Sequence, residues 1–260
     1  MPTDSTCGLI DTLTPRPRGV IFDYGNTLIP FGQREMDAIG GALVRFFLAE
    51  IEGVEPDRVR ESLAATMSRL HRHRVETDAE SDPRDVIRLT FAAMGKTADE
   101  ERHVDRGIEV ILRAFVAAVR QAEGAKAVLE TLREGGYKLA LLSNYSLSAA
   151  ITESLDRLGL SEYFDAVVIS ADEGLVKPHP ELFRTAARRL KLEPAEVLFV
   201  GDNPRADIAG AAAVGMRTAH ITEHISGAYF FEDPAENEAE IRPDLVLDRL
   251  TRLTGGNHHG

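Results

Sequence analysis

The sequence predicts an α/β protein in which a doubly wound parallel sheet carries an inserted all-helical domain. Two observations predict this fold. Short apolar runs alternate with helical patterns through the second half of the chain, and residues 33–120 break that alternation because they contain no convincing strand. The 260 residues, 43% hydrophobic and 28% charged, suffice for one large domain or for one domain that carries an inserted module.

Six short apolar runs, each bounded by turn residues, predict the strands of the sheet. Parallel strands are covered on both faces, so they are typically hydrophobic throughout and do not alternate with polar residues. The runs cover residues 20–22, 139–142, 167–169, 197–200, 218–221 and 245–247. Helical patterns separate them at residues 125–134, 148–158, 180–190 and 206–214. Glycine follows several of these helices, as a left-handed helix end favours.

The inserted segment has the spacing of amphipathic helices, as in Ile39, Leu43 and Phe46. Its prolines and glycines predict about four helices, the last of which ends near Arg120. We expect its Leu, Phe and Met stripes to pack against one another. The predicted organisation is a flexible tail over residues 1–17, an α/β core over residues 18–32 and 121–254, and a helical insertion over residues 33–120.

The formal charge of −12 argues against nucleic acid as a partner, because phosphate-backbone binding needs a concentrated basic surface. The basic run at residues 69–74 lies in a helical pattern, where it predicts a solvated face or, alternatively, a patch that faces substrate or a partner. The sequence shows no signal peptide and no apolar run of membrane-spanning length, so we expect a cytoplasmic protein with no membrane contact. The single cysteine, Cys7, excludes an internal disulfide, and residues 232–240 predict an acidic surface loop. The oligomeric state stays open.

Four polar sites each follow one of the predicted strands, where open α/β sheets bind ligands. They are Asp23 to Thr27, Ser143 with Asn144, Lys177, and Asp202 to Asp207. Carboxylates that meet at one edge repel each other unless a cation neutralises them, and oxygen ligands suit Mg²⁺. With a phosphoryl group bound, a lysine and the metal would spread its negative charge, and an aspartate held against the metal becomes a plausible nucleophile.

Four segments of the sequence resemble, in order, the four signatures of the haloacid dehalogenase-like hydrolases. They are VIFDYGNTL, LLSN, KPHPELF and VGDNPRADIAGAAAVGM. The insertion at residues 33–120 is similar to the helical cap that some members carry after the first strand. The resemblance covers about residues 18–250. It implies a Mg²⁺-dependent phosphohydrolase that acts on a small phosphorylated metabolite through an aspartyl-phosphate intermediate.

The resemblance also implies a role for each matching residue. Asp23 would be the catalytic nucleophile, steadied by Lys177. The metal would be held by Asp23, the backbone carbonyl of Gly25 and Asp202, with Asp207 supporting the metal shell. The phosphate would be held by Thr27, Ser143, Asn144 and Lys177. The alternative interpretations are turn capping for Thr27 and Ser143, and a surface salt-bridge cluster for Asp23, Lys177 and Asp202.

Gly25 departs from the family pattern. Most phosphatases that the sequence resembles have a second aspartate two residues after the nucleophile, which protonates the leaving group and then activates water. Such acid–base assistance contributes roughly a hundredfold to ten-thousandfold in rate. Three explanations stay open: the leaving group needs little protonation, as in acyl, aryl or anomeric sugar phosphates; a cap residue such as His71 or His73 acts instead; or the protein has exchanged catalysis for binding.

Three other functions compete with the phosphatase. A catalytically weak phosphate-binding or regulatory module would explain Gly25. A haloacid dehalogenase would also lack the second aspartate, but the resemblance implies that this branch lacks the paired carboxylates that Asp202 and Asp207 provide. A phosphonatase would need a cap lysine, and the insertion offers only Lys96, which lies in a predicted turn.

Overall fold

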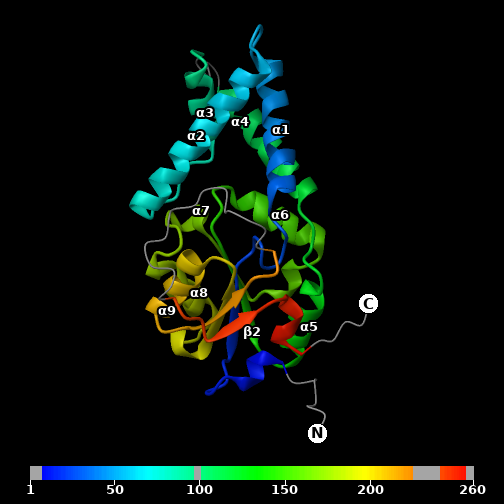
Figure 1. Cartoon of the computed structure of the whole chain (residues 1–260), viewed down its shortest axis with the longest axis vertical. Helices are drawn as coiled ribbons and strands as arrows, with labels where there is room; N and C mark the ends of the chain where they lie inside the picture. The colour runs from blue at the N-terminus through cyan, green and yellow to red at the C-terminus, as the bar shows by residue number, and fades with distance from the viewer. Residues whose placement is uncertain (1–7, 97–100, 225–240, 256–260) are drawn as a thin grey trace.

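A computed structural model describes residues 8–96, 101–224 and 241–255 of the chain. Its centre is a parallel sheet in the order β3-β2-β1-β4-β5-β6, and a group of helices stands above one end of it (Figure 1). The strands are β1 Gly19–Phe22, β2 Lys138–Ser143, β3 Ala166–Ile169, β4 Val197–Gly201, β5 Arg217–Ile221 and β6 Leu245–Leu247. The predicted fold class is confirmed, and each predicted strand end lies within one residue of the observed one.

Both faces of the sheet are buried, which explains why its strands are apolar throughout. Successive side chains of a strand point to opposite faces, so Val20 and Phe22 join one core cluster and Ile21 joins the other. Helices α5 (Ala125–Glu134) and α6 (Ser148–Leu158) pack in the first cluster. Helices α8 (Pro180–Leu190) and α9 (Gly210–Ala213) pack in the second. The sheet is therefore covered on both sides, as a doubly wound fold requires.

The helix predicted over residues 206–214 begins as a wider turn. Residues Pro204–Ala209 form a π-type helix, η4, and α9 continues from it. The backbone N–H groups of Asp207 and Ile208 both donate to the carbonyl of Asn203, at 2.9 and 3.2 Å, and the second of these bonds widens the turn. The side chain of Asn203 also accepts from the N–H of Ala206 at 2.8 Å. This local geometry places Asp207 toward the end of the sheet, which helical periodicity alone does not predict.

Short helical turns complete the core. They are η1 Leu9–Thr12, η2 Ser161–Tyr163, α7 Ser170–Glu173, η3 Pro194–Glu196 and η6 Leu250–Leu253. The expected flexible tail is wrong for residues 8–17, because Ile10 is only 2% exposed and packs in the core. Gly8 lies so close to Leu253 and Thr254 that any side chain at position 8 would overlap their backbone. Cys7 and the predicted acidic loop at residues 232–240 lie outside the described residues.

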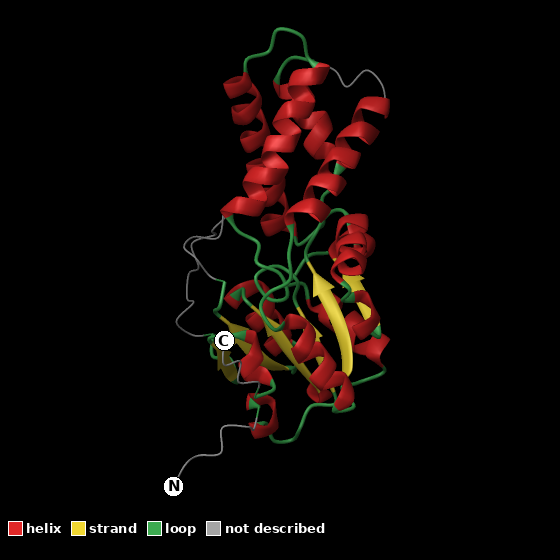
Figure 2. Cartoon of the chain, turned by 90° about the vertical axis from the view of Figure 1, so that its right-hand side faces the viewer, coloured by secondary structure: helices red, strands yellow, loops and turns green. Residues whose placement is uncertain are grey.

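Four helices occupy the inserted segment in the described structure. They are α1 Gln33–Glu50, α2 Pro56–Thr77, α3 Arg84–Ala93 and α4 Glu101–Ala118. They pack around an apolar cluster in which the rings of Phe47 and Phe91 lie 5.0 Å apart. Figure 2 shows them as a separate group above the sheet, joined to the core by loops. Within the described residues, no helix combines the length and apolar character that crossing a bilayer requires.

The end of α2 contacts the core a second time, away from the linkers of the insertion. The N–H of Val176 donates to the carbonyl of Asp78 at 2.9 Å, and the N–H of Glu80 donates to the carbonyl of Gly174 at 3.0 Å. The carboxylate of Glu80 pairs with Arg74 at 3.1 Å and accepts a hydrogen bond from Ser170. Arg74, the last residue of the predicted basic run, therefore ties α2 to the core.

Candidate active site

The predicted polar sites meet at the carboxyl ends of the central strands. Asp23 follows β1, Ser143 ends β2, and Asp202 follows β4, while Lys177 arrives from the loop after α7. Together they surround a cavity of about 230 Å³ between the sheet and the helical insertion. The cavity is lined by Asp23, Tyr24, Gly25, Asn26, Ile29, Phe31, Phe115, Ser143, Asn144, Tyr145, Ile151, Lys177, Asp202, Asn203, Ala206 and Asp207.

The ammonium of Lys177 bridges two carboxylates. Its Nζ lies 2.6 Å from Oδ1 of Asp23 and 2.7 Å from Oδ1 of Asp207. Burial alone would lower the pKa of Lys177, but the two carboxylates outweigh that effect and raise it, so the ammonium stays charged. The side chains of Lys177 and Asp207 are each 2% exposed and that of Asp23 is 10% exposed, which excludes the alternative of a surface salt-bridge cluster.

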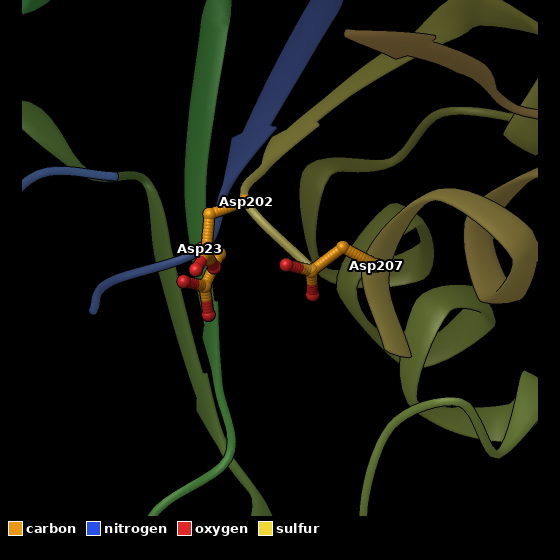
Figure 3. Close-up of side chains that lie close together, drawn as sticks. All are labelled: Asp23, Asp202 and Asp207. Atoms are coloured by element: carbon orange, nitrogen blue, oxygen red, sulfur yellow. The ribbon is translucent and has the colours of Figure 1, made fainter. Parts of the chain in front are cut away.

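Three buried carboxylates, those of Asp23, Asp202 and Asp207, lie close together at this site (Figure 3). Asp23, Asp202 and Asp207 each place one oxygen within 4.8 Å of the others. Burial raises the pKa of Asp23 to about 6 despite Lys177, and burial together with the charge of Asp23 raises that of Asp202. One ammonium cannot neutralise three carboxylates. The donor set therefore fits a divalent cation that prefers oxygen ligands, and such a cation would remove the remaining repulsion.

Gly201 and Asn203 determine where Asp207 lies. A side chain at Gly201 would overlap the carboxylate of Asp207, so the close approach of the two segments requires glycine at position 201. The backbone N–H of Asn203 donates to Oδ2 of Asp207 at 3.1 Å. These contacts and the ion pair with Lys177 fix Asp207 from both sides.

Two supporting residues were missed by the sequence analysis. Asn26 adopts a left-handed conformation with φ 54°, and its amide nitrogen donates to Oδ2 of Asp202 at 3.2 Å. Its amide oxygen accepts from the N–H of Phe31 at 3.0 Å, so Asn26 joins the carboxylate cluster to the turn after β1. Nε2 of His220, on β5, lies 2.8 Å from the backbone oxygen of Asp202. Asparagine in a turn that follows an aspartate was the available signal for Asn26.

The predicted phosphate-binding residues occupy different positions. Ser143 is buried and lines the cavity. Asn144 also lines it, but its amide oxygen accepts from the N–H of Lys177 at 2.7 Å and its amide nitrogen donates to the carbonyl of Lys177 at 3.0 Å. Thr27 is completely buried, and its hydroxyl donates to Oδ2 of Asp23 at 3.5 Å. Asn144 thus positions Lys177, and Thr27 supports Asp23 from below the cavity.

Three aromatic side chains form one wall of the cavity. The ring of Phe115, on α4, lies 5.6 Å from that of Phe31 and 4.6 Å from that of Tyr145. Phe115 is 2% exposed, whereas Phe31 and Tyr145 are half-buried. The aromatic residues of the insertion were predicted to serve packing alone, whereas Phe115 also lines the cavity.

Gly25 lies directly under this wall. A Cβ atom at position 25 would meet only Cβ of Phe31, at 3.7 Å, which is ordinary contact. The candidate replacement acids of the insertion lie elsewhere, because neither His71 nor His73 is among the described residues that line the cavity. Lys96, the candidate phosphonatase lysine, is exposed beyond the end of α3 and does not line the cavity either.

The chain is similar to known hydrolases over most of its length. Residues 17–215 match the model of the haloacid dehalogenase-like hydrolase family. A glyceraldehyde 3-phosphate phosphatase of Methanopyrus kandleri is 31% identical over 91% of this chain and 95% of its own. A ribulose-1,5-bisphosphate 5-phosphatase of Halopiger xanaduensis is 37% identical over 54% of this chain and 58% of its own. The crystal structure of a 2-haloacid dehalogenase from Pseudomonas syringae superposes with a TM-score of 0.66 at 26% identity, covering 91% of this chain and 96% of that one.

Proposed function

The chain belongs to the haloacid dehalogenase-like hydrolases, and we propose that within this family it is a Mg²⁺-dependent phosphatase with Asp23 as its nucleophile. The relatives named above establish a hydrolase of the phosphatase type. The observation that carries the proposed mechanism is the buried ammonium of Lys177 between Asp23 and Asp207, with Asp202 beside them. A nucleophilic carboxylate, a fixed positive charge and a set of oxygen ligands then face one cavity.

Each residue of this site has a separate role in phosphoryl transfer. Oδ2 of Asp23 attacks the phosphorus atom, and the bond from phosphorus to the leaving oxygen breaks with the electron pair going to the leaving group. Lys177 holds Oδ1 of Asp23 in place and stabilises negative charge on the transferring group. The hydroxyl of Ser143 donates to a phosphate oxygen. A water oxygen then bonds to phosphorus, the bond from phosphorus to Oδ2 of Asp23 breaks, and inorganic phosphate leaves while the carboxylate of Asp23 is restored; the proton that water loses passes to the leaving group through solvent.

Mg²⁺ would be held by Asp23, the carbonyl of Gly25 and Asp202, with Asp207 supporting the shell, and it would supply positive charge to the phosphoryl group. We further propose that residues 33–120 act as a cap, because Phe115 of α4 lines the cavity. The two relatives are named for small phosphorylated metabolites, which supports a small phosphate ester as substrate. The cytoplasmic location stays a prediction.

The test is a panel of phosphate esters assayed with wild-type protein and with Asp23→Asn. Wild-type protein should release phosphate from at least one ester when Mg²⁺ is present and should stop when a chelator removes it. Asparagine has nearly the shape of aspartate but cannot form the acyl phosphate, so turnover should fall at least about ten-thousandfold. Circular dichroism and thermal unfolding would show whether the variant stays folded. Turnover that survives in Asp23→Asn would remove Asp23 from the mechanism.

Dehalogenation is the second candidate, because the superposed crystal structure is that of a 2-haloacid dehalogenase. Asp202 and Asp207 argue against it, since a halide leaving group needs no metal and buried carboxylates near a haloacid substrate would repel it. Release of chloride from a 2-chloroacid without added metal would favour the dehalogenase. Binding of phosphate without turnover of any ester would favour a regulatory module instead.

A further inference from the structure

Phe31 is the neighbour that a side chain at position 25 would contact first. The Cβ direction of Gly25 points to Phe31, and the N–H of Phe31 is held by the amide oxygen of Asn26 at 3.0 Å. Asn26 in turn bonds to Asp202. The backbone of Phe31 is therefore tied to the carboxylate cluster, and its side chain lines the same cavity as Asp23.

The rest of this wall extends the same apolar surface. Phe115 also lines the cavity, and its ring lies 5.6 Å from that of Phe31 and 4.6 Å from that of Tyr145. Ile29 and Ile151 line the cavity as well. Among the described lining residues, the carboxylates and the ammonium are Asp23, Asp202, Asp207 and Lys177, which lie together, and the other ionisable side chains are the two tyrosines Tyr24 and Tyr145. The cavity thus has a charged end for phosphate and an aromatic side for the group attached to it.

On the basis of the proposed phosphatase function, we propose that the site takes aryl phosphates, whose flat leaving group stacks against Phe31, Phe115 and Tyr145 and departs without a proton from the protein. An aromatic ring packs favourably against aromatic side chains in offset or tilted geometry. The aromatic wall and Gly25 then suit the same substrate class. The wall binds the ring, and the absence of an acid at position 25 does not slow the reaction because the leaving group is stable as an anion.

The step balances without a general acid. Oδ2 of Asp23 forms a bond to phosphorus, the bond from phosphorus to the phenolic oxygen breaks, and the phenolate takes the electron pair. A phenol ionises with a pKa of about 10, far below that of an aliphatic alcohol, so the phenolate can leave unprotonated. Water later replaces Asp23 on phosphorus, and the proton that it loses reaches the phenolate through solvent.

Three substrates separate ring recognition from leaving-group acidity. Phenyl phosphate has both properties, cyclohexyl phosphate has the size without the acidity or the flat ring, and acetyl phosphate has the acidity without the ring. Wild-type protein with Mg²⁺ should prefer phenyl phosphate to cyclohexyl phosphate by at least about a hundredfold in kcat/KM. Phenylphosphonate should also inhibit more strongly than methylphosphonate, which reports binding apart from turnover.

Variants of the wall complete the test. Phe31→Leu and Tyr145→Leu should each lower kcat/KM for phenyl phosphate about tenfold and leave acetyl phosphate within about twofold, because only the ring contact is lost. Tyr145→Phe, which keeps the ring, should resemble wild type. Phe46→Leu makes the same change in the core of the insertion, at a residue that does not line the cavity, and should leave both substrates unaffected.

The outcomes distinguish this inference from the function on which it rests. If acetyl phosphate and phenyl phosphate are both stable in the presence of wild-type protein and Mg²⁺, the phosphatase assignment itself fails. If acetyl phosphate is hydrolysed but phenyl and cyclohexyl phosphate react equally, the phosphatase stands and the aromatic selection is wrong. A loss in Tyr145→Phe as large as that in Tyr145→Leu would also overturn it, because the hydroxyl would then be the acting group.

Discussion

Oδ1 of Asp23 lies 2.6 Å from the ammonium of Lys177, and both side chains are buried at the carboxyl end of the sheet. The same ammonium contacts Asp207 at 2.7 Å. A buried ion pair costs desolvation when it forms, but removing one partner leaves the other charge uncompensated. Lys177 therefore offsets the repulsion of the clustered carboxylates, and in the proposed mechanism it also holds Asp23 in place.

Lys177→Met should remove both contributions. Without Mg²⁺ the variant should lose about 3–5 kcal/mol of unfolding free energy in urea titrations, since Asp23 and Asp207 stay buried with no countercharge. Added Mg²⁺ should restore part of that loss. Turnover should not return, because the charge that holds Asp23 and the phosphoryl group is gone. Lys126→Met, on the exposed side of α5, is the matched control and should change stability by less than about 0.5 kcal/mol. Equal losses in both variants would contradict this account.

Mg²⁺ should raise the melting temperature of the wild-type protein. A ligand that binds only the folded state, at a concentration of about a hundred times its Kd, stabilises that state by about 2.7 kcal/mol. For a chain of this size, that free energy raises the melting temperature by several degrees. Asp202→Asn should largely abolish that shift, because it removes one of the three clustered carboxylates. Asp156→Asn, at an exposed position of α6, should keep it. Differential scanning fluorimetry with and without Mg²⁺ measures the shift, and a full shift in Asp202→Asn would place the cation elsewhere.

Gly25→Asp should raise turnover of alkyl phosphates. The backbone at Gly25 is not in the left-handed region, and a Cβ atom there meets only Phe31 at 3.7 Å, so the substitution introduces no backbone strain. A carboxyl group at this position can protonate an alkoxide leaving group. Such acid catalysis typically raises the rate by about a hundredfold or more. Gly25→Asn adds similar bulk without the proton and should show no gain. Steady-state rates with cyclohexyl and phenyl phosphate measure this effect. A rise in turnover in both Gly25→Asp and Gly25→Asn would indicate a change in substrate binding, not in acid catalysis.

The strand-end aspartates and the lysine were predictable from the sequence because each follows an apolar run. Parallel strands place their carboxyl ends at one edge, so the positions of Asp23 and Asp202 followed directly from the runs, and that of Lys177 from a run and the loop after it. The helix ends were equally readable, since α5, α6 and α8 begin and end where the glycine, proline and apolar spacing predicted. These features depend on local chemistry that each segment carries by itself.

The aromatic wall and the supporting contacts were not predictable in that way. Phe115 belongs to a helical apolar stripe, and such a stripe looks the same whether its residues face another helix or a cavity. Asn144 has the right position for phosphate contact, but its amide is bonded to the backbone of Lys177, which lies 33 residues further along the chain. Contacts between distant segments depend on how the loops pack, and one sequence does not contain that information.

Asp244 connects the start of β6 to β5, and its contribution to the free energy of unfolding should fall at acidic pH. Its carboxylate pairs with Arg217 at 2.8 Å and accepts from the N–H of Thr218 at 2.9 Å. Burial alone would raise the pKa of Asp244, but these two donors outweigh it and lower the pKa. A lowered pKa in the folded state means that the contribution is complete above the unfolded value and is lost as pH falls.

Asp244→Asn should therefore cost about 1 kcal/mol at pH 7, a modest value because the pair is partly exposed and screened by water. The difference from wild type should shrink as pH drops below about 4, where the wild-type carboxylate also takes up a proton. Urea titrations of both proteins from pH 7 to pH 3 measure this difference, and the other carboxylates cancel because both proteins share them. Asp248→Asn, whose partner Arg249 is 3.9 Å away at an exposed site, should cost little at any pH. A constant deficit for Asp244→Asn across that range would mean that its hydrogen bonds stabilise the strand pair without help from its charge.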